Sequence, residues 1–310
     1  MVEVADKTET CDGVVALKLR RPDGAALPRW SSGAHIDLDL RPGMIRQYSL
    51  CGDPDDESTW QIAVLRESDG RGGSQYVHDN LRVGETMGVR GPRNNFRLED
   101  SPNYLFIAGG IGITPIMSMA AQIDRADRSW QLVYGGRSLQ SMAFAEELYQ
   151  RYPANVTLHP QDQHGLIDLD KLLSVEMPET LVYCCGPPAL LDAVTARCAH
   201  WSPGALRIER FTARQFVSQM RHDSFEVELA LTGKTITVDS TESVLDAVRA
   251  CGVQVLSSCE EGTCGTCETP VLAGTVDHRD SVLTDVERAA NDTMMICVSR
   301  ARCPRLVLEV

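Results

Sequence analysis

The sequence predicts a multidomain protein made of an antiparallel β-barrel, a parallel α/β sheet and a small C-terminal domain with grouped cysteines. Its 310 residues are enough for two or three domains. The hydrophobic pattern changes from short strands to alternating strands and helices near residue 99, and changes again near residue 223. The predicted domains are therefore 1–98, 99–222 and 223–310, with a linker at about 213–223.

The composition limits the kinds of ligand. The chain has 30 Lys and Arg against 43 Asp and Glu, a net charge of −13. Binding of nucleic acid needs clustered basic residues, so we expect no nucleic-acid ligand. Residues 223–310 hold 7 basic and 15 acidic residues, a net charge of −8. This concentration of acidity predicts that the third domain docks to a basic patch on a protein partner.

No targeting segment is visible. The first ten residues lack a basic region followed by an apolar stretch, so we expect a cytoplasmic protein without a disulfide framework. The uncharged stretch between Asp100 and Asp124 is long enough to cross a membrane. Three glycines and Pro115 interrupt it, which indicates a buried strand, a glycine turn and a helix instead. We therefore expect no membrane association.

The first domain is predicted from strand-like segments. Apolar or alternating runs occupy residues 14–21, 34–40, 46–50, 60–67 and 85–91, and turn sequences with Pro, Asp and Gly separate them. Strands at this spacing, without long helical patterns, are typical of a small antiparallel barrel.

The second and third domains show mixed patterns. Strands at Tyr104–Ala108, Trp130–Tyr134, Val156–Leu158 and Thr180–Cys184 alternate with helical windows at 114–126, 141–151 and 188–200, which predicts a parallel α/β sheet. Residues 224–310 begin with a hairpin, continue with a helix over 244–251 and a cysteine-rich loop, and end in short strands.

The strongest chemical signal is the spacing C-x₄-C-x₂-C formed by Cys259, Cys264 and Cys267, with Cys297 downstream. This is the spacing of a plant-type ferredoxin 2Fe–2S site. The small residues between the cysteines let backbone N–H groups approach the sulfurs. Zinc would more naturally use two matched C-x₂-C pairs, and a redox dithiol would leave Cys259 unexplained. Two nearby cysteines outside the spacing are expected to be ordinary buried residues, Cys251 and Cys303.

Two strand ends suggest a nucleotide site. The segment Gly109–Pro115 follows a predicted strand and opens a helix, a turn that lets backbone N–H groups face a pyrophosphate. A plain strand–helix turn is the alternative. The sequence Cys185-Gly186-Pro187 ends another strand of the same sheet. Since α/β sheets bind ligands at their carboxyl edge, the two turns together predict a dinucleotide crevice.

The barrel holds a third signal, Arg46-Gln47-Tyr48-Ser49-Leu50, followed later by Arg71-Gly72-Gly73-Ser74. An Arg with glycine N–H groups and a hydroxyl can hold a phosphate, and a Tyr can pack on a flat ring. Taken alone, the first segment is equally a strand with one inward Tyr, and the second a simple turn.

The motifs R-x-Y-S-L, R-G-G-S, G-P-R-N-x-F, G-G-I-G-I-T-P, C-G-P and C-x₄-C-x₂-C…C follow one another in a single order. In this order the chain resembles the phthalate dioxygenase reductase family over essentially its whole length. The resemblance implies an FMN-binding barrel, an NAD-binding α/β domain of the ferredoxin–NADP reductase type and a β-grasp ferredoxin domain.

The resemblance also implies roles for single residues. The candidate catalytic residues are Ser49 near the flavin N5, Thr114 close to flavin and nucleotide, and Cys185 beside the nicotinamide. Phe211 would cover the isoalloxazine, with a strand-end core Phe as the alternative. The candidate cofactor-binding residues are Arg46, Gln47, Tyr48, Ser49, Leu50, Ala63, Val64, Gly72, Gly73, Ser74, Gly110, Gly112, Thr114, Pro115, Arg137, Ser138, Cys185, Gly186, Pro187 and Phe211. The candidate metal ligands are Cys259, Cys264, Cys267 and Cys297.

The implied function is an NADH-dependent reductase that passes electrons through FMN and a 2Fe–2S cluster to a terminal Rieske oxygenase, and the chain is expected to be monomeric. Plant-type clusters near −400 mV can reduce a Rieske centre at roughly −150 mV or above. Arg137 and Ser138 could accept a 2′-phosphate, so NADPH is the alternative nucleotide. The alternative functions are a stand-alone flavin or ferric reductase and a redox sensor.

Overall fold

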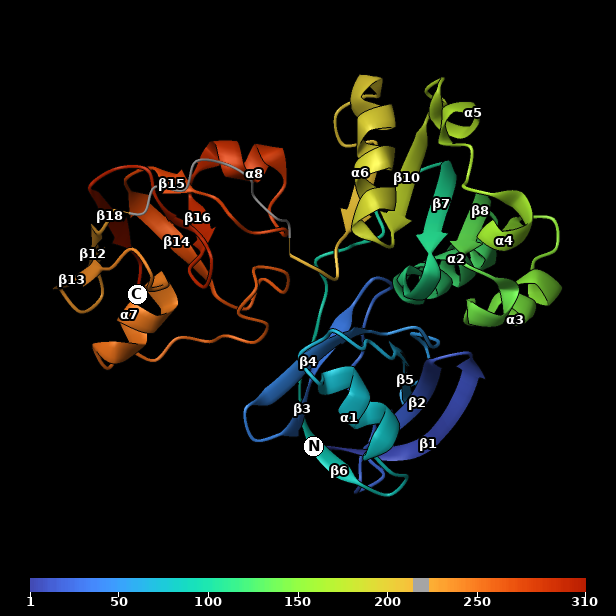
Figure 1. The fold of residues 1–310 in the computed structure, drawn as a ribbon, viewed down its shortest axis with the longest axis horizontal. Helices are drawn as coiled ribbons and strands as arrows, with labels where there is room; N and C mark the ends of the chain where they lie inside the picture. The colour runs from blue at the N-terminus through green and yellow to red at the C-terminus, as the bar shows by residue number, and fades with distance from the viewer. Residues whose placement is uncertain (214–222) are drawn as a thin grey trace. The chain divides into compact units, whose positions relative to one another are not determined.

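The structure is a computed structural model that describes residues 1–213 and 223–310. The chain forms two compact units, Met1–Glu209 and Arg210–Val310 (Figure 1). Most of the predicted linker at 213–223 lies outside the described residues. Within those residues, no helix combines the length and the apolar character that crossing a membrane requires.

The first unit begins with the predicted antiparallel barrel. Its six strands follow the order β4-β3-β6-β1-β2-β5, and a bridge between Leu50 and Ile62 joins the end of β4 to β5. Side chains such as Leu17, Ile36 and Trp60 fill the interior. The strands are β1 (Val2–Cys11), β2 (Val14–Arg20), β3 (His35–Arg41), β4 (Met44–Ser49), β5 (Trp60–Leu65) and β6 (Thr86–Arg93).

Two elements of the barrel were not predicted. β1 carries many charged residues and is buried mainly at its start, so it has no continuous apolar pattern. The helix α1 (Gly73–Asp79) continues from the expected Gly-Gly-Ser turn. The ammonium group of Lys7 on β1 donates to the carbonyl oxygens of Val77, His78 and Leu81 at 2.7, 2.8 and 2.9 Å. Lys7 thereby caps the C-terminal end of α1 and fixes the helix against the barrel.

The second part of this unit is the predicted parallel sheet, with strand order β11-β10-β7-β8-β9. Along β7, Tyr104 and Phe106 face one hydrophobic cluster and Leu105 and Ile107 face another, so helices cover both faces. Its strands are β7 (Asn103–Gly109), β8 (Ser129–Gly136), β9 (Val156–Pro160), β10 (Thr180–Cys185) and the unpredicted β11 (Leu206–Glu209). Its helices are η1 (Gly110–Gly112), α2 (Ile113–Arg125), η2 (Leu139–Ser141), α3 (Ala145–Arg151), α4 (Gln161–His164), α5 (Leu169–Leu173), α6 (Pro188–Arg197) and η3 (Cys198–His200).

The second unit has the expected β-grasp fold. Its main sheet has the order β13-β12-β18-β14-β16; β12 and β18 are parallel and the other neighbours antiparallel. Val244, Leu245 and Val248 of the helix α7 (Val244–Ala250) are buried in its core. The other elements are β12 (Phe225–Leu229), β13 (Lys234–Val238), β14 (Glu268–Ala273), β15 (Val276–Asp277), α8 (Asp285–Ala290), β16 (Thr293–Met295), β17 (Arg300–Ala301) and β18 (Arg305–Leu308).

Candidate functional site

The predicted flavin-binding residues lie on and beside β4. Arg46 to Ser49 belong to this strand, and Leu50 follows it. Ser49 is buried and pairs with His35 of β3, whereas Tyr48 packs partly against the barrel core. Burial raises the pKa of Tyr48, and the positive charge of the nearby Arg46 works against this rise. The strand therefore places Tyr48 and Ser49 on opposite faces, as its pleat requires.

The candidates on the neighbouring strand β5 have different surroundings. Ala63 belongs to the hydrophobic cluster that includes Met117 of α2. Val64 lies in the barrel core, and its carbonyl oxygen is 2.9 Å from Nε2 of His78. The backbone of Val64 therefore contacts the helix α1, to which His78 belongs.

Arg46 lies against the start of α1. Its Nη2 donates to the carbonyl oxygen of Arg71 at 2.6 Å. A Cβ atom on Gly73 would lie 2.5 Å from Cγ of Arg46, so only glycine leaves room for this side chain. Gly72 has a φ of 77°, and the Ser74 hydroxyl accepts from the Glu67 N–H at 3.0 Å. The structure thus brings together the predicted phosphate-binding residues.

The glycine-rich turn and the Cys-Gly-Pro turn contact each other backbone to backbone. They follow β7 and β10, which are adjacent strands. A Cβ atom on Gly112 would lie 2.3 Å from the carbonyl oxygen of Cys185, and one on Gly186 would lie 3.0 Å from Cα of Gly109. Since the strand order reverses between β7 and β10, the two turns meet at the switch point where doubly wound sheets bind ligands.

The remaining nucleotide candidates lie along the same edge. Thr114 is buried, and its hydroxyl donates to the carbonyl oxygen of Ile111 at 3.0 Å. Pro115 is buried in the first turn of α2, and Pro187 precedes α6. Arg137 and Ser138 follow β8. The predicted crevice residues therefore share the carboxyl edge of one sheet.

Glu209 is a site residue that the sequence analysis missed. It ends β11, directly opposite Cys185 of β10. Its side chain accepts a hydrogen bond from Ser49, and one carboxyl oxygen, Oε2, has no partner in the described residues. Burial raises the pKa of Glu209 to about 8, although the Ser49 hydrogen bond opposes the shift. A carboxyl group therefore lies between the predicted flavin and nicotinamide residues, largely protonated at neutral pH.

The same surroundings act on Cys185. Burial, together with the nearby Glu209 and Cys184, raises the pKa of the Cys185 thiol well above its ordinary value. The thiol consequently stays protonated and neutral, which makes it a packing group rather than a nucleophile.

The four candidate metal ligands gather in the second unit. Cys259, Cys264 and Cys267 lie in the loop between α7 and β14, Cys297 lies between β16 and β17, and all four are buried. The side chain of Cys259 contacts those of Cys264 and Cys297, and Cys267 contacts Cys297. These contacts hold the pKa of Cys259 well below its ordinary value.

Backbone N–H groups surround the sulfurs. The N–H groups of Glu261 and Thr263 donate to Sγ of Cys259 at 3.3 and 3.4 Å, and that of Thr266 donates to Sγ of Cys264 at 3.4 Å. Among the residues that the structure describes, no group of three or more His, Cys, Asp or Glu side chains is arranged so that it could hold a single metal ion. A 2Fe–2S cluster has two irons and shares four thiolates between them, so the donor set fits the cluster.

Cys251 and Cys303 lie apart from this set, as expected. Sγ of Cys251 donates to the carbonyl oxygen of Val248 at 3.0 Å, and Sγ of Cys303 to that of Arg305 at 3.0 Å. Both are only partly buried, so the expectation that they are buried was wrong. Cys251 follows the last residue of the short helix α7, and Cys303 lies between β17 and β18, so each side chain is partly exposed.

Comparisons with known proteins agree with this arrangement. Models of an oxidoreductase FAD-binding domain, an oxidoreductase NAD-binding domain and a 2Fe–2S iron–sulfur cluster binding domain match residues 1–98, 106–196 and 227–302. The phthalate dioxygenase reductase of Burkholderia cepacia is 37% identical over 100% of this chain and 97% of its own length. The chain belongs to the phthalate dioxygenase reductase family.

Other members and a longer protein show the same likeness. The putative toluene-4-sulfonate monooxygenase system reductase subunit of Comamonas testosteroni is 42% identical over 100% of this chain and 98% of its own. An intact type IV self-sufficient cytochrome P450 monooxygenase matches with a TM-score of 0.93 and 43% identity. That match covers 100% of this chain and 40% of the solved chain, so this chain spans two fifths of that protein.

The chain is therefore an oxidoreductase with flavin-binding, NAD-binding and 2Fe–2S domains, as the phthalate dioxygenase reductase family predicts. Phe211 belongs to the second unit and is 40% exposed. Its predicted contact with the flavin involves both units and stays a prediction.

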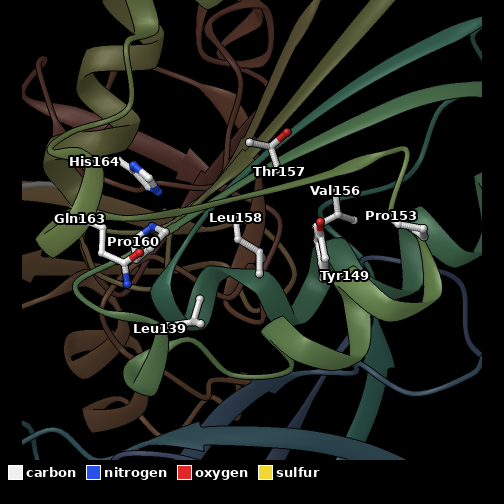
Figure 2. Close-up of a pocket in the computed structure, with 9 residues that line it drawn as sticks. All are labelled: Leu139, Tyr149, Pro153, Val156, Thr157, Leu158, Pro160, Gln163 and His164. Atoms are coloured by element: carbon white, nitrogen blue, oxygen red, sulfur yellow. The ribbon is translucent and has the colours of Figure 1, made fainter.

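A cavity of about 450 Å³ opens along the edge strand β9 of this family member (Figure 2). Gln163 and His164 lie at one end, near Pro160, and Tyr149 and Pro153 lie at the other. The carbonyl oxygen of Arg137 accepts from the Asp162 N–H at 3.0 Å, so the loop after β8 lies next to this end of the cavity. The sequence analysis did not predict the cavity, since its lining comes from four separate segments.

Proposed function

We propose that this member of the phthalate dioxygenase reductase family binds FMN and NADH and passes electrons through its 2Fe–2S cluster to the Rieske centre of a terminal oxygenase. The observation that carries the proposal is the buried set of four cysteines with N–H donors, in the same chain as two closely packed turns at a sheet switch point. When bound, FMN would supply both the two-electron chemistry that NADH requires and the one-electron chemistry that the cluster requires.

The roles of the protein are placement and electrostatics. Arg46 and the turn of Gly72 and Gly73 would hold the single phosphate of FMN, because a guanidinium and glycine N–H groups suit a phosphate. The close contact between Gly112 and the backbone of Cys185 holds the two turns together, and the nicotinamide would bind beside them.

At the reacting end, Ser49, Cys185 and Glu209 would surround the position of hydride transfer. The raised pKa values of Glu209 and Cys185 keep both groups neutral near pH 7. A negative charge here would oppose the arrival of a hydride, so a protonated carboxyl group favours the transfer. Thr114 already donates to the turn of η1 and would line the crevice.

The adenosine half of the nucleotide would extend toward the loops after β8 and β9. Arg137 and Ser138 lie there, beside one end of the cavity along β9. We propose NADH as the nucleotide, with these two residues contacting its ribose side. The steady-state kcat/KM for NADH and NADPH tests this choice, and a preference for NADPH would contradict it.

The relatives bear on the identity of the electron acceptor. The family relatives are reductases of oxygenase systems by their names, which supports a Rieske oxygenase. A haem monooxygenase is a second candidate, because the solved chain with the high TM-score of 0.93 joins the same module to a cytochrome P450. Parallel assays with a Rieske oxygenase and a separate P450 domain distinguish the two.

The central test is an anaerobic titration of the purified full chain with NADH, followed by absorption spectroscopy. We expect flavin and 2Fe–2S bands that bleach together, with three electrons taken up per chain. Heat-released flavin, identified by chromatography, should be FMN. Absence of the iron–sulfur bands, or bleaching of the flavin alone, would contradict the relay, and released FAD would contradict the flavin assignment.

A further inference from the structure

Glu260, directly after the ligand Cys259, has an unusual backbone conformation. Its φ is 56°, in the left-handed region that favours glycine. In or near this loop, three more residues of the described chain have a positive φ, and all three are glycines: Gly252, Gly262 and Gly265. A glutamate at such a position indicates that its side chain has a use in the loop.

The Glu260 side chain belongs to a closed ring of hydrogen bonds. Arg249, in the last turn of α7, donates from Nη1 to Oε1 of Glu260 at 2.9 Å and from Nη2 to the hydroxyl of Ser257. The Ser257 hydroxyl in turn donates to Oε1 of Glu260 at 3.0 Å. An exposed ion pair alone contributes little, but here the third member, Ser257, is buried and fixes the geometry of the other two.

The conformation of Glu260 sets the direction of the following N–H groups. A left-handed residue within a turn creates a concave row of N–H groups that binds anions. In this loop the N–H groups of Glu261 and Thr263 both point at Sγ of Cys259. Glu260 thus connects the ion pair to the hydrogen bonds that the Cys259 sulfur receives.

The opposite side of the loop is held by the backbone. The N–H of Ser281 donates to the carbonyl oxygen of Gly262 at 2.7 Å, and a Cβ atom on Gly262 would lie 3.0 Å from Cα of Asp280. The loop therefore cannot move toward residues 280–281. The hydrogen bonds among Arg249, Glu260 and Ser257 hold its other side.

We propose that Arg249, acting through Glu260 and Ser257, is a positioning residue that sets the reduction potential of the 2Fe–2S cluster. It does so by keeping the Glu261 and Thr263 N–H groups on the Cys259 sulfur, since hydrogen bonds to the ligand sulfurs raise the potential of such clusters. The proposal rests on the cluster binding at the four cysteines, and it assigns no new ligand.

The test uses the full, cluster-loaded chain with the substitutions Arg249→Gln and Glu260→Gln. Arg249→Gln removes the guanidinium, and Glu260→Gln removes the charge that strengthens both bonds to Oε1, so each weakens the ring and should lower the potential. We expect about a threefold change in the ratio of oxidised to reduced cluster, or about 28 mV for one electron. A purely electrostatic effect would shift the potential in opposite directions in the two variants, because Arg249→Gln removes a positive charge and Glu260→Gln removes a negative one.

Matched controls come from a second ion pair of the same unit, Arg305 with Glu228. Arg305→Gln and Glu228→Gln change the charge equally but lie on β18 and β12, outside the cysteine loop. We expect the reduction potential to fall in Arg305→Gln and to rise in Glu228→Gln, as the change of charge alone requires. Hydrogen exchange gives a second readout: the N–H groups of Glu261 and Thr263 should exchange about tenfold faster in both ring variants and unchanged in the controls.

The outcomes separate this inference from the proposed function. A rise in potential with Glu260→Gln, or unchanged exchange in both ring variants, would overturn the positioning role while the cluster remains intact. If the unsubstituted chain shows no 2Fe–2S spectrum, both the proposed function and this inference fail. Recovery of the potential in Arg249→Lys, which keeps the charge but lacks the two-pronged donor, would also contradict the proposal.

Discussion

The hydroxyl of Ser49 is hydrogen-bonded to the buried carboxyl group of Glu209. Ser49 ends β4 of the barrel and Glu209 ends β11 of the parallel sheet, so this one bond joins the predicted flavin surface to the predicted nucleotide crevice. Because Cys185 lies opposite Glu209 in the sheet register, Ser49, Glu209 and Cys185 form one small polar group.

The first prediction concerns pH and Glu209. A folded-state pKa of about 8 lies above the ordinary 4.5, so the folded chain binds more protons between these values and loses stability as the pH rises from about 4.5 to 8. Glu209→Gln should remove this loss, which amounts to roughly 1.4 kcal/mol for each pKa unit. Urea unfolding of the flavin-free chain at pH 5 and pH 8 measures it, with Glu226→Gln as the exposed control. Parallel pH profiles for Glu209→Gln and the unsubstituted chain would contradict the prediction.

The second prediction concerns the cluster. Cys264→Ser should abolish electron delivery to the oxygenase and leave the reduction of flavin by NADH within about twofold, because the candidate nucleotide and flavin residues other than Phe211 lie in the other unit. Stopped-flow absorbance measures both steps. Cys303→Ser, outside the cluster spacing, should change neither. The proposed relay is wrong if Cys264→Ser still reduces the partner at the normal rate.

The third prediction concerns the flavin phosphate. Arg46→Ala removes the guanidinium that lies against Arg71 and Gly73, and loss of a charge-assisted hydrogen bond costs roughly 1.5–3 kcal/mol. Flavin affinity should fall about tenfold to a hundredfold, measured by fluorescence of the released flavin. Arg20→Ala, which breaks an exposed pair with Glu3, is the control. Full flavin occupancy in Arg46→Ala at limiting flavin would argue against this role.

The fourth prediction concerns the contact between the two turns. In Gly112→Ala the new methyl group would lie 2.3 Å from the backbone oxygen of Cys185, so the crevice must widen. We expect the Kd for NADH to rise by at least about tenfold, with a loss of roughly 1–3 kcal/mol of stability. Gly88→Ala on β6, which like Gly112 has no positive φ and where the added Cβ atom meets only the Asp39 side chain, at 3.1 Å, is the control. Unchanged NADH affinity in Gly112→Ala would place the nucleotide elsewhere.

The fifth prediction concerns salt. The second unit contains most of the acidic excess, with 7 basic and 15 acidic residues over 223–310. Docking to a basic partner should therefore slow as ions screen the charges, on the order of tenfold between 50 and 500 mM salt. The rate of partner reduction measures this, with the rate of flavin reduction by NADH as the internal control. A rate independent of salt would remove the electrostatic docking surface.

The sequence was most informative where chemistry requires several residues at fixed spacing. The cysteine spacing predicted a set that the structure brings together, and the two glycine-containing turns that were predicted to share one edge of the sheet lie side by side there. β1 and α1 were missed because their stability comes from distant partners: Lys7 reaches α1 across about seventy residues. Tertiary contacts of this kind leave no local periodicity.

Single residues in the site were harder to predict for the same reason. Glu209 stands alone in its segment, and only the pairing of β10 with β11 places it opposite Cys185. Arg249 and Glu260 are eleven residues apart, and nothing in their spacing indicates that α7 ends beside the cysteine loop. Such partners become visible only when the fold is known.

The position of β18 determines when the second unit can form during synthesis. This strand, Arg305–Leu308, lies inside the sheet between β12 and β14 rather than at an edge. Until β18 emerges from the ribosome, the pair of β12 and β13 and the pair of β14 and β16 have no strand between them. The loop with three of the cysteines then has no completed sheet behind it. The sheet behind the cysteine loop can therefore be completed only after β18 has been synthesised, whereas all residues of the first unit precede Arg210.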